Sequence, residues 1–371
     1  MRVNWLALTD FRSYAAARLD LAPEGLTVVV GENGQGKTNL LEALGWLATL
    51  ASFRGAPNDA LVRQGAASAF VRAEADREGR RLTLEAEIPS VGAPRVLVNG
   101  QPLRRARDLL GAIRVSVFSP DDLALVKGGP SERRRLLDDA LVALAPQHAE
   151  TIAAVERVLR QRGALLRQAG GKASPEVVAT LDVWDTKLAE HGAALVVARR
   201  ALVTRLESVT AKAYAAVASG AAAIGLRYVS SWDGRGERDD RDEREALHAA
   251  LTAARTDDLR RGVTTVGPHR DDLELQIGPL YARTHASQGE QRSLALALRL
   301  AVHEAVTDST GAAPILLLDD VFSELDPHRS AALLKNLPVG QAILTTASPL
   351  PPGAQPAATV RIVGEQIMAA P

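Results

Sequence analysis

A glycine-rich loop near the start of the chain constrains its fold more than any other feature. Residues 31–38 read Gly-Glu-Asn-Gly-Gln-Gly-Lys-Thr, directly after the apolar run Leu26–Val30 and before residues that favour a helix. Phosphate binding requires this order of strand, loop and helix, because the glycines let backbone N–H groups point at a phosphate. The sequence therefore predicts a nucleoside triphosphate site in an α/β fold.

The side chains of this loop have separate expected roles. Lys37 bridges phosphate oxygens and is a catalytic candidate, while the hydroxyl of Thr38 is a candidate ligand of Mg²⁺. The residues expected to contact the nucleotide are Gly31, Glu32, Asn33, Gly34, Gln35, Gly36, Lys37, Thr38 and Asn39.

A second element of the same site lies far along the chain. The apolar run Ile315–Leu318 ends in Asp319 and Asp320, which is typical of a buried parallel strand with acids at its carboxyl end. We expect Asp319 to hold Mg²⁺ through water. Asp320 is expected to orient the attacking water as a general base.

The segment Ser287-Gln288-Gly289-Glu290-Gln291 opens a long helical run and has two interpretations. Ser287 and Glu290 have the spacing of a capping box. The small hydroxyl, the glycine and the helix amino terminus also make an anion site suited to a γ-phosphate. We favour the second interpretation, with Ser287 and Gly289 contacting the nucleotide and Ser287 as a catalytic candidate.

Composition limits the other possibilities. The chain of 371 residues contains no cysteine, which excludes disulfides and thiolate metal sites and fits a reducing cytoplasm. Its first residues lack the apolar core of a signal peptide, and no apolar run approaches the roughly 20 residues that span a bilayer. We expect a cytoplasmic protein without a membrane partner. Its 44 basic and 44 acidic residues cancel, so DNA binding would depend on a local basic face.

Both ends of the chain show mixed strand and helix signals. Strands are expected at Val3–Leu8, Leu26–Val30, Phe70–Asp76, Leu82–Ile88 and Ile113–Phe118, with a hairpin turn at Asn99-Gly100. Strand and helix signals return from Val263 to the end. The charged stretch 234–245 is expected to be a solvated loop, with a charged helix start as the alternative.

The middle of the chain is expected to be helical. Helix-favouring residues run from Ser131 to about Val217, and the expected break is residues 170–175, where two glycines stop one helix and Ser174-Pro175 opens the next. Apolar residues at heptad-like spacing follow in the second helix, which could reach roughly 60 Å. Two arrangements fit this periodicity: an antiparallel helical arm that projects from the α/β domain, and a helical bundle packed on that domain.

The phosphate elements resemble those of a known superfamily. Residues 287–291 resemble the signature motif of ABC-type ATPases, and Ser323–Asp326 resembles their D-loop. The resemblance implies that the signature of one subunit closes on the P-loop of another, which in this chain is the glycine-rich loop at residues 31–38. ATP would then hold together a homodimer.

A finer resemblance is to the RecF family of recombination mediators, in the branch shared with SMC and Rad50 proteins. Its segments span nearly the whole chain: Phe11–Tyr14, Phe118–Leu123 leading to Gly129–Arg134, Gly267–Leu273 and Asp319–Asp326. The resemblance implies an ABC-type head made of both ends of the chain, residues 1–120 and 259–371, with an inserted helical arm domain at 121–258. It also implies that Arg12 contacts the nucleotide, and a solvent-exposed arginine without that role is the alternative.

The chain departs from the wider ABC pattern at three positions. Asp320 replaces the glutamate common in transporters, as in the RecF pattern, which implies slow hydrolysis. The switch histidine is missing, which leaves Thr345, Thr346 and Ser348 as alternatives for sensing the γ-phosphate. No glutamine occupies the usual Q-loop position near Phe118-Ser119.

The resemblance further implies a function in DNA repair and replication restart. The expected protein is an ATP-dependent dimer that recognises gapped or junction DNA and, with RecO and RecR, promotes loading of the RecA recombinase; DNA-stimulated hydrolysis resets it. The alternative is a Rad50/SMC-like ATPase subunit of a DNA-end-processing complex. A transporter ATPase fits less well, because of the long helical insertion.

The sequence leaves two interpretations for each of two further features. Arginine pairs and triplets at 104–105, 133–135, 199–200 and 260–261 are able to neutralise DNA phosphates or to be ordinary solvated helix faces. The segment Gly267–Leu273 is expected to be a polar turn with ion pairs to Arg270, and a metal site of His269, Asp271 and Asp272 is the alternative.

Overall fold

The computed structural model describes residues 1–77, 79–218, 222–232 and 240–369. The chain divides into two compact units. The first consists of Met1–Leu123, Lys212–Ala221 and Gln288–Pro371, and the second of Ala124–Ala211 and Ala222–Ser287. The first unit is thus built from both ends of the chain, as the sequence predicts for an ABC-type α/β head.

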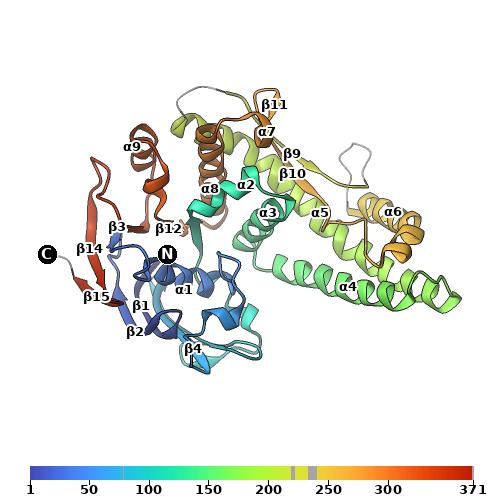
Figure 1. Cartoon of the computed structure of the whole chain (residues 1–371), viewed down its shortest axis with the longest axis horizontal. Helices are drawn as coiled ribbons and strands as arrows, with labels where there is room; N and C mark the ends of the chain where they lie inside the picture. Colours follow the sequence, from blue (N-terminus) through green and yellow to red (C-terminus); the bar gives the residue numbers. More distant parts are fainter. Residues whose placement is uncertain (78, 219–221, 233–239, 370–371) are drawn as a thin grey trace. The chain divides into compact units, whose positions relative to one another are not determined.

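The centre of the first unit is a mainly parallel sheet in the order β15-β14-β3-β13-β12-β8. Its early strand β3 pairs in parallel with the late strands β13 and β14, and these segments lie side by side in Figure 1. The strands are β3 (Gly25–Val30), β8 (Val115–Phe118), β12 (Ile315–Asp319), β13 (Gln341–Thr346), β14 (Pro356–Val363) and β15 (Gln366–Ala369).

An antiparallel sheet in the order β2-β1-β4-β5-β6-β7 completes the strands of this unit. Its members are β1 (Arg2–Phe11), β2 (Tyr14–Asp20), β4 (Ser68–Arg77), β5 (Arg80–Pro89), β6 (Arg95–Val98) and β7 (Gln101–Pro102). Asn99 and Gly100 form the predicted turn, both with positive φ. Strand β2 was not predicted, because its exposed face breaks the apolar alternation.

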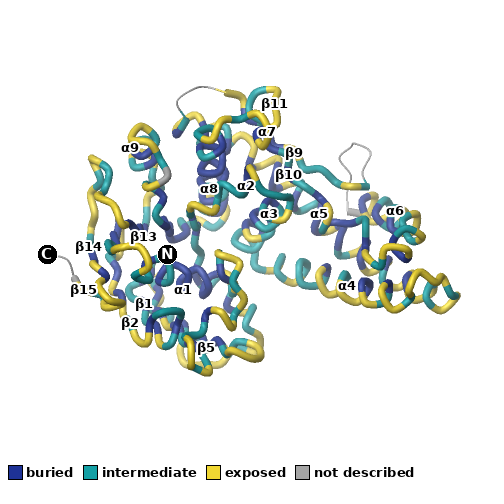
Figure 2. Tube along the Cα trace, viewed as in Figure 1, coloured by how far each residue is buried: buried dark blue, intermediate teal, exposed yellow. Residues whose placement is uncertain are grey.

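Helices cover both faces of the parallel sheet. They are α1 (Lys37–Thr49), α8 (Gln288–Thr310) and α9 (Pro327–Lys335), with short 3-10 turns η1 (Asn58–Leu61), η2 (Ala106–Leu109), η3 (Pro120–Asp122) and η4 (Val321–Glu324). Figure 2 shows α1 and α8 as largely buried.

Alternation along the central strands divides the core into two layers. Val29 and Leu317 pack with α1 and the antiparallel sheet, whereas Val28 and Leu316 pack with Leu296 of α8. Successive strand residues point to opposite faces, so one apolar run serves both layers. This arrangement fixes the carboxyl ends of β3, β12 and β13 at one edge of the sheet.

The second unit is mainly helical and includes a small sheet in the order β11-β10-β9. Its elements are α3 (Pro130–Leu144), α4 (His148–Ala169), β9 (Ile224–Val229), α6 (Asp240–Arg261), β10 (Asp272–Ile277), β11 (Leu280–Tyr281) and α7 (Ala282–His285). Two helices have residues in both units, α2 (Leu123–Lys127) and α5 (Pro175–Val217).

The structure differs from the sequence expectations in this region. A break at Ala145–Gln147 separates α3 from α4, in addition to the expected one at 170–175, because Pro146 cannot continue a helix. Residues 259–287 lie in the second unit, since β10 pairs with β9 along its whole length. Of the stretch 234–245, residues 234–239 lie outside the described residues, and Asp240 onward is helical, as in the alternative.

No helix among the described residues is both long and apolar enough to cross a membrane.

Candidate functional site

The P-loop occupies the turn between β3 and α1, and α1 begins at Lys37 itself. Lys37 is buried, and its ammonium donates to the carbonyls of Gly31 and Glu32 at 2.8 Å each. Burial lowers the pKa of Lys37, while Asp320 and then Asp319 act in the opposite direction. Glu32, Asn33 and Gly34 are exposed, so the turn of the loop is accessible to a ligand.

The P-loop contacts the last residue of strand β12 through a side-chain hydrogen bond. The hydroxyl of Thr38 donates to Oδ1 of Asp319 at 2.8 Å. Burial raises the pKa of Asp319, and the hydrogen bonds from Thr345 and Thr38 oppose this shift. A hydroxyl and a buried carboxylate within hydrogen-bond distance are the hard oxygen donors that Mg²⁺ prefers, so these residues fit the predicted metal.

Asp320 has a strained backbone beside Asp319. Its φ is 47°, in the left-handed region, and its N–H donates to both the carbonyl and the hydroxyl oxygen of Thr345 at 3.1 Å. Its Oδ1 is buried and has no hydrogen-bond partner among the described residues. An unpaired carboxylate oxygen beside a phosphate loop is suited to accept a hydrogen bond from water.

Thr345 is the residue that contacts both acids. Its hydroxyl donates to Oδ1 of Asp319 at 2.7 Å and accepts from the N–H of Asp320. Thr346 instead bonds to the main chain of Ser348. Of the three residues that the sequence offers near the missing switch histidine, Thr345 is therefore the one in contact with the acids.

The turn between β1 and β2 packs against the P-loop. Asn39 donates to the hydroxyl of Ser13 at 3.1 Å, and a Cβ on Gly36 would lie 2.9 Å from the hydroxyl oxygen of Tyr14. Burial, and after it Glu365, raises the pKa of Tyr14. The motif Phe11–Tyr14 thus supports the loop from the amino-terminal side.

This contact yields a stability prediction for Gly36→Ala. Gly34 and Gly36 have φ values of 84° and 87°, but a Cβ on Gly34 would meet nothing within 4 Å. We expect Gly34→Ala to cost about 1–2 kcal/mol from backbone strain alone. Gly36→Ala should cost about 1–3 kcal/mol more because it also overpacks the Tyr14 contact. Urea unfolding without nucleotide measures both, and equal losses would contradict the packing role.

Arg12, the other predicted nucleotide contact of this turn, binds within the protein. Its guanidinium donates to both oxygens of Glu42 at 2.8 and 2.7 Å and to the carbonyl of Ala60 at 2.7 Å. Glu42 is fully buried and also accepts from Ser52. In this arrangement Arg12 anchors the turn to α1, and its contact with nucleotide remains a prediction.

The signature segment begins α8. Ser287 and Gln288 are exposed, and a Cβ on Gly289 would lie 2.7 Å from a guanidinium nitrogen of Arg329. Arg329 of α9 donates to the hydroxyl of Ser293 at 3.0 Å and pairs with Asp326. The arginine therefore connects the start of α8 with the D-loop segment, a link that no sequence motif indicated.

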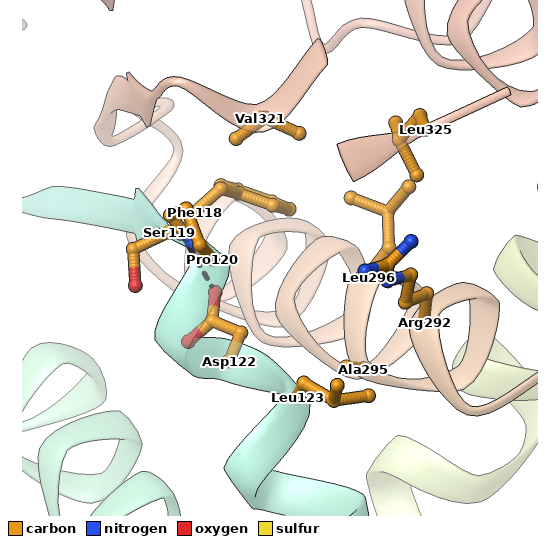
Figure 3. Close-up of a pocket in the computed structure, with 10 residues that line it drawn as sticks. All are labelled: Phe118, Ser119, Pro120, Asp122, Leu123, Arg292, Ala295, Leu296, Val321 and Leu325. Atoms are coloured by element: carbon orange, nitrogen blue, oxygen red, sulfur yellow. Dashed lines mark hydrogen bonds between the residues drawn. The ribbon is translucent and has the colours of Figure 1, made fainter. Parts of the chain in front are cut away.

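The segment after β8 lies where a Q-loop would be. Ser119 donates its N–H to Asp122, whose Oδ1 accepts from Arg299 of α8 at 2.6 Å. The segment borders a cavity of about 440 Å³, part of it open to solvent. Figure 3 shows the cavity between the end of β8, α8 and η4. It is lined by Phe118, Ser119, Pro120, Asp122, Leu123, Arg292, Ala295, Leu296, Val321 and Leu325.

The turn between β14 and β15 also touches the P-loop. The N–H of Gly364 donates to the side chain of Gln35 at 2.8 Å, and a Cβ on Gly31 would lie 3.0 Å from the carbonyl oxygen of Ile362. No sequence motif indicated this contact, which depends on the pairing of β14 with β3.

Residues 267–271 form the expected polar turn, which leads into β10, but the expected ion pairs with Arg270 are wrong among the described residues. Asp272 accepts two bonds from Arg133, and Asp271 accepts from the hydroxyl of Tyr228 at 2.5 Å. Burial raises the pKa of Asp271 to about 7. The acids are held by partners on α3 and β9, and the guanidinium of Arg270 donates instead to the carbonyl of Thr264.

Comparison with known proteins identifies the relatives of this chain. The model of the RecF/RecN/SMC N terminal domain matches residues 2–348. The chain is 48% identical to the DNA replication and repair protein RecF of Frankia alni over 94% of this chain and 93% of that protein. It is also 48% identical to RecF of Kineococcus radiotolerans, with the same coverage.

Solved structures agree with these relatives. The recombination mediator protein RecF in the RecFOR pathway, solved with ATP, is 30% identical with a TM-score of 0.91 over 100% of this chain and 98% of that chain. The Smc head bound to the C-winged helix domain of ScpA is 15% identical, with a TM-score of 0.57 over 100% of this chain and 97% of that chain. The second match concerns the fold alone.

Proposed function

This chain belongs to the RecF family, and from that premise we propose that it is an ATP-dependent recombination mediator in DNA repair and replication. Relatives at 48% identity are named DNA replication and repair proteins, and a related structure contains ATP. The observation that carries the proposal is the 2.8 Å contact between Thr38 and Asp319, which joins the P-loop to the acidic strand.

The proposed reaction is slow ATP hydrolysis. Lys37, now bonded to loop carbonyls, would turn to the phosphate oxygens. Thr38 and Asp319 would hold Mg²⁺, which supplies neutralisation of charge on the phosphates. Asp320 would accept a proton or hydrogen bond from the attacking water through its unpaired Oδ1. Thr345 keeps both acids in place.

The proposed assembly is a homodimer closed by ATP. Ser287 and Gly289 of one copy would complete the nucleotide site of the other. If DNA fits only the closed dimer, then ATP and DNA must strengthen each other's binding by the same factor. Hydrolysis releases both, and DNA is expected to stimulate it. We propose gapped or junction duplex DNA as the ligand, and RecO and RecR as partners in loading RecA.

The alternative, a Rad50/SMC-like subunit of a DNA-end-processing complex, has weaker support. The chain is 48% identical to RecF proteins but 15% identical to Smc heads. The longest helix among the described residues, α5, has 43 residues, which is too short for a long coiled-coil tether.

Sedimentation of the wild type, Lys37→Arg and Ser287→Arg with ATP and gapped duplex tests this proposal. We expect the wild type to dimerise with ATP and to bind DNA at least 10-fold more tightly as a dimer, a gain of about 1.4 kcal/mol. Both variants should stay monomeric, because each removes one half of the shared site.

Ser90→Arg is the matched control, since Ser90 is exposed at the end of β5 and outside the predicted site. It should behave as the wild type. If all four proteins remain monomeric and bind DNA equally, the mediator proposal loses its mechanism.

A further inference from the structure

Most of the arginine clusters along the chain are neutralised by acids in the fold. The pairs are Arg105 with Asp108, Arg133 with Asp272, Arg135 with Asp139, Arg199 with Asp138, Arg200 with Glu243, and Arg260 and Arg261 with Asp257. Arg133 and Arg199 are also buried, at 4% and 3% exposure. The buried pairs stabilise the fold, and in every pair an acid lies beside the arginine and offsets its charge.

Arg134 is different from its neighbours on α3. Its guanidinium donates to the main-chain carbonyl of Asp271 at 2.7 Å, and no carboxylate in the described part of the chain forms an ion pair with it. The side chain is half-buried, so this bond holds it in a fixed position. A carbonyl accepts a hydrogen bond without cancelling the charge, and Arg134 therefore keeps its positive charge.

Arg270 has the same kind of anchor. Its Nε and a terminal nitrogen donate to the carbonyl of Thr264 at 3.3 and 3.1 Å, and it too lacks an acidic partner among residues 1–77, 79–218, 222–232 and 240–369. The side chain is exposed. Thr264 and Asp271 both lie in the segment between α6 and β10. The fold therefore anchors to this segment two arginines that lie far apart in sequence and that form no ion pair with a described acid.

The acids around this pair are already engaged. Asp271 accepts from Tyr228, Asp272 from Arg133, and Asp138 from Arg199. His269 shares the Thr264 carbonyl with Arg270. Burial lowers the pKa of His269 to about 4, and the charges of Arg270 and Arg134 add to that effect. Asp272, Asp271 and Asp138 are near enough to act on the charge of Arg134. Among the described residues, however, none of these acids forms an ion pair with Arg134 or Arg270.

We propose that Arg134 and Arg270 form a phosphate-binding site of the second unit that takes the sugar–phosphate backbone of duplex DNA. The inference rests on the DNA binding of the proposed function and names a site for it. Guanidinium groups bind phosphate oxygens through parallel N–H bonds, and carbonyl anchors leave other N–H groups for this purpose. Aromatic residues make up 4% of the chain, which favours backbone contact over stacking with bases.

The test is DNA binding by the full-length protein with ATP over a range of salt concentrations. Arg270→Gln and Arg134→Gln should each weaken binding to duplex DNA about 10-fold, as expected for one charged hydrogen bond. Each should lower the slope of log affinity against log salt by about 1, with lysine at the same position restoring part of it.

Arg227→Gln is the control, because Arg227 is exposed in the same unit and its charge is already matched by Glu274. It removes the same net charge and should leave the slope unchanged. Arg270 is exposed, so Arg270→Gln remains informative if Arg134→Gln fails to fold.

The outcomes separate this inference from the proposed function. If the wild type binds DNA and both Gln variants keep its affinity and salt slope, the phosphate site is overturned and the mediator function stands. An acidic protein would then be the ligand to test next. Absence of DNA binding by the wild type would overturn both. Loss of ATP-dependent dimerisation in the variants would instead assign the arginines a structural role and contradict the inference.

Discussion

Replacing Arg162 by alanine is expected to destabilise the second unit by about 3–5 kcal/mol, the usual cost of leaving buried charges without their partner. Arg162 of α4 is fully buried, and so are its two acidic partners. Its guanidinium donates to Asp185 of α5 and to Asp258 of α6, each at 2.7 Å. One side chain therefore cross-links three helices.

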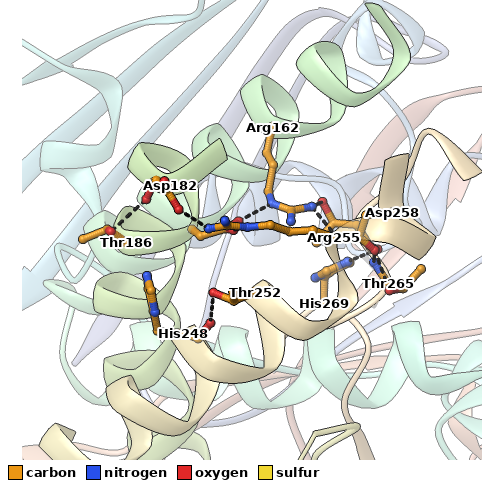
Figure 4. Close-up of polar contacts among 11 residues, drawn as sticks. Arg162, Asp182, Thr186, His248, Thr252, Arg255, Asp258, Thr265 and His269 are labelled. Carbon is orange, nitrogen blue, oxygen red and sulfur yellow. Dashed lines mark hydrogen bonds and ion pairs between the residues drawn. The ribbon is translucent and has the colours of Figure 1, made fainter. Parts of the chain in front are cut away.

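Neighbouring groups compensate only part of the loss. Figure 4 shows Arg162 and Arg255 side by side among the acids. Arg255 would still pair with Asp185 at 2.7 Å. Asp258 would keep the bonds from Thr265 but lose its counter-charge. We therefore expect Asp258→Asn, added to Arg162→Ala, to recover part of the stability by removing the stranded charge.

Urea unfolding of the full-length protein, monitored by circular dichroism, measures this effect. Arg160→Ala is the control, since Arg160 lies on the same helix, is 69% exposed and has Glu156 as its partner at 3.7 Å. Its removal should change the free energy of unfolding by less than about 0.5 kcal/mol. A similarly small change for Arg162→Ala would show that the buried network contributes little to the fold.

The second large effect is expected for Asp320→Asn, which should slow ATP hydrolysis by about 10²- to 10⁴-fold and leave nucleotide binding intact. Asparagine has the same shape and is tolerated in the left-handed conformation that Asp320 adopts at φ 47°. Its N–H can keep both bonds to Thr345. The substitution therefore removes the basic oxygen and little else.

Single-turnover phosphate release and equilibrium nucleotide binding distinguish the two steps. Asp308→Asn, an exposed acid on α8, is the control and should hydrolyse ATP as the wild type does. Under the proposed function, the Asp320→Asn dimer should also hold DNA for longer, because hydrolysis is what releases it. If Asp320→Asn hydrolyses ATP at a rate within about 3-fold of the wild type, another group orients the water, because loss of a general base should slow hydrolysis far more.

The secondary structure around the contiguous motifs could be predicted well. The P-loop, the strand ending in Asp319-Asp320 and the start of α8 each lie within one short segment, and each has the expected secondary structure. Strand alternation and helix periodicity likewise predicted β1, β3, β4, β5 and α5. Strand β2 and the break at Pro146 were missed, the first because of its exposed face and the second because the surrounding residues favour helix.

The sequence by itself determined which backbone conformations and which chemical groups are available: glycines where φ is positive, a lysine and a threonine at a helix start, and paired acids after a buried strand. Local sterics and hydrogen bonding decide these features, so neighbouring residues encode them. The tertiary structure alone decided which distant groups meet. It placed the hydroxyl of Thr38 within hydrogen-bond distance of Asp319, brought Thr345 into contact with the same acid, and bonded Arg134 and Arg270 to main-chain carbonyls. Such contacts depend on strand pairing and packing summed over the whole fold, which no single segment contains.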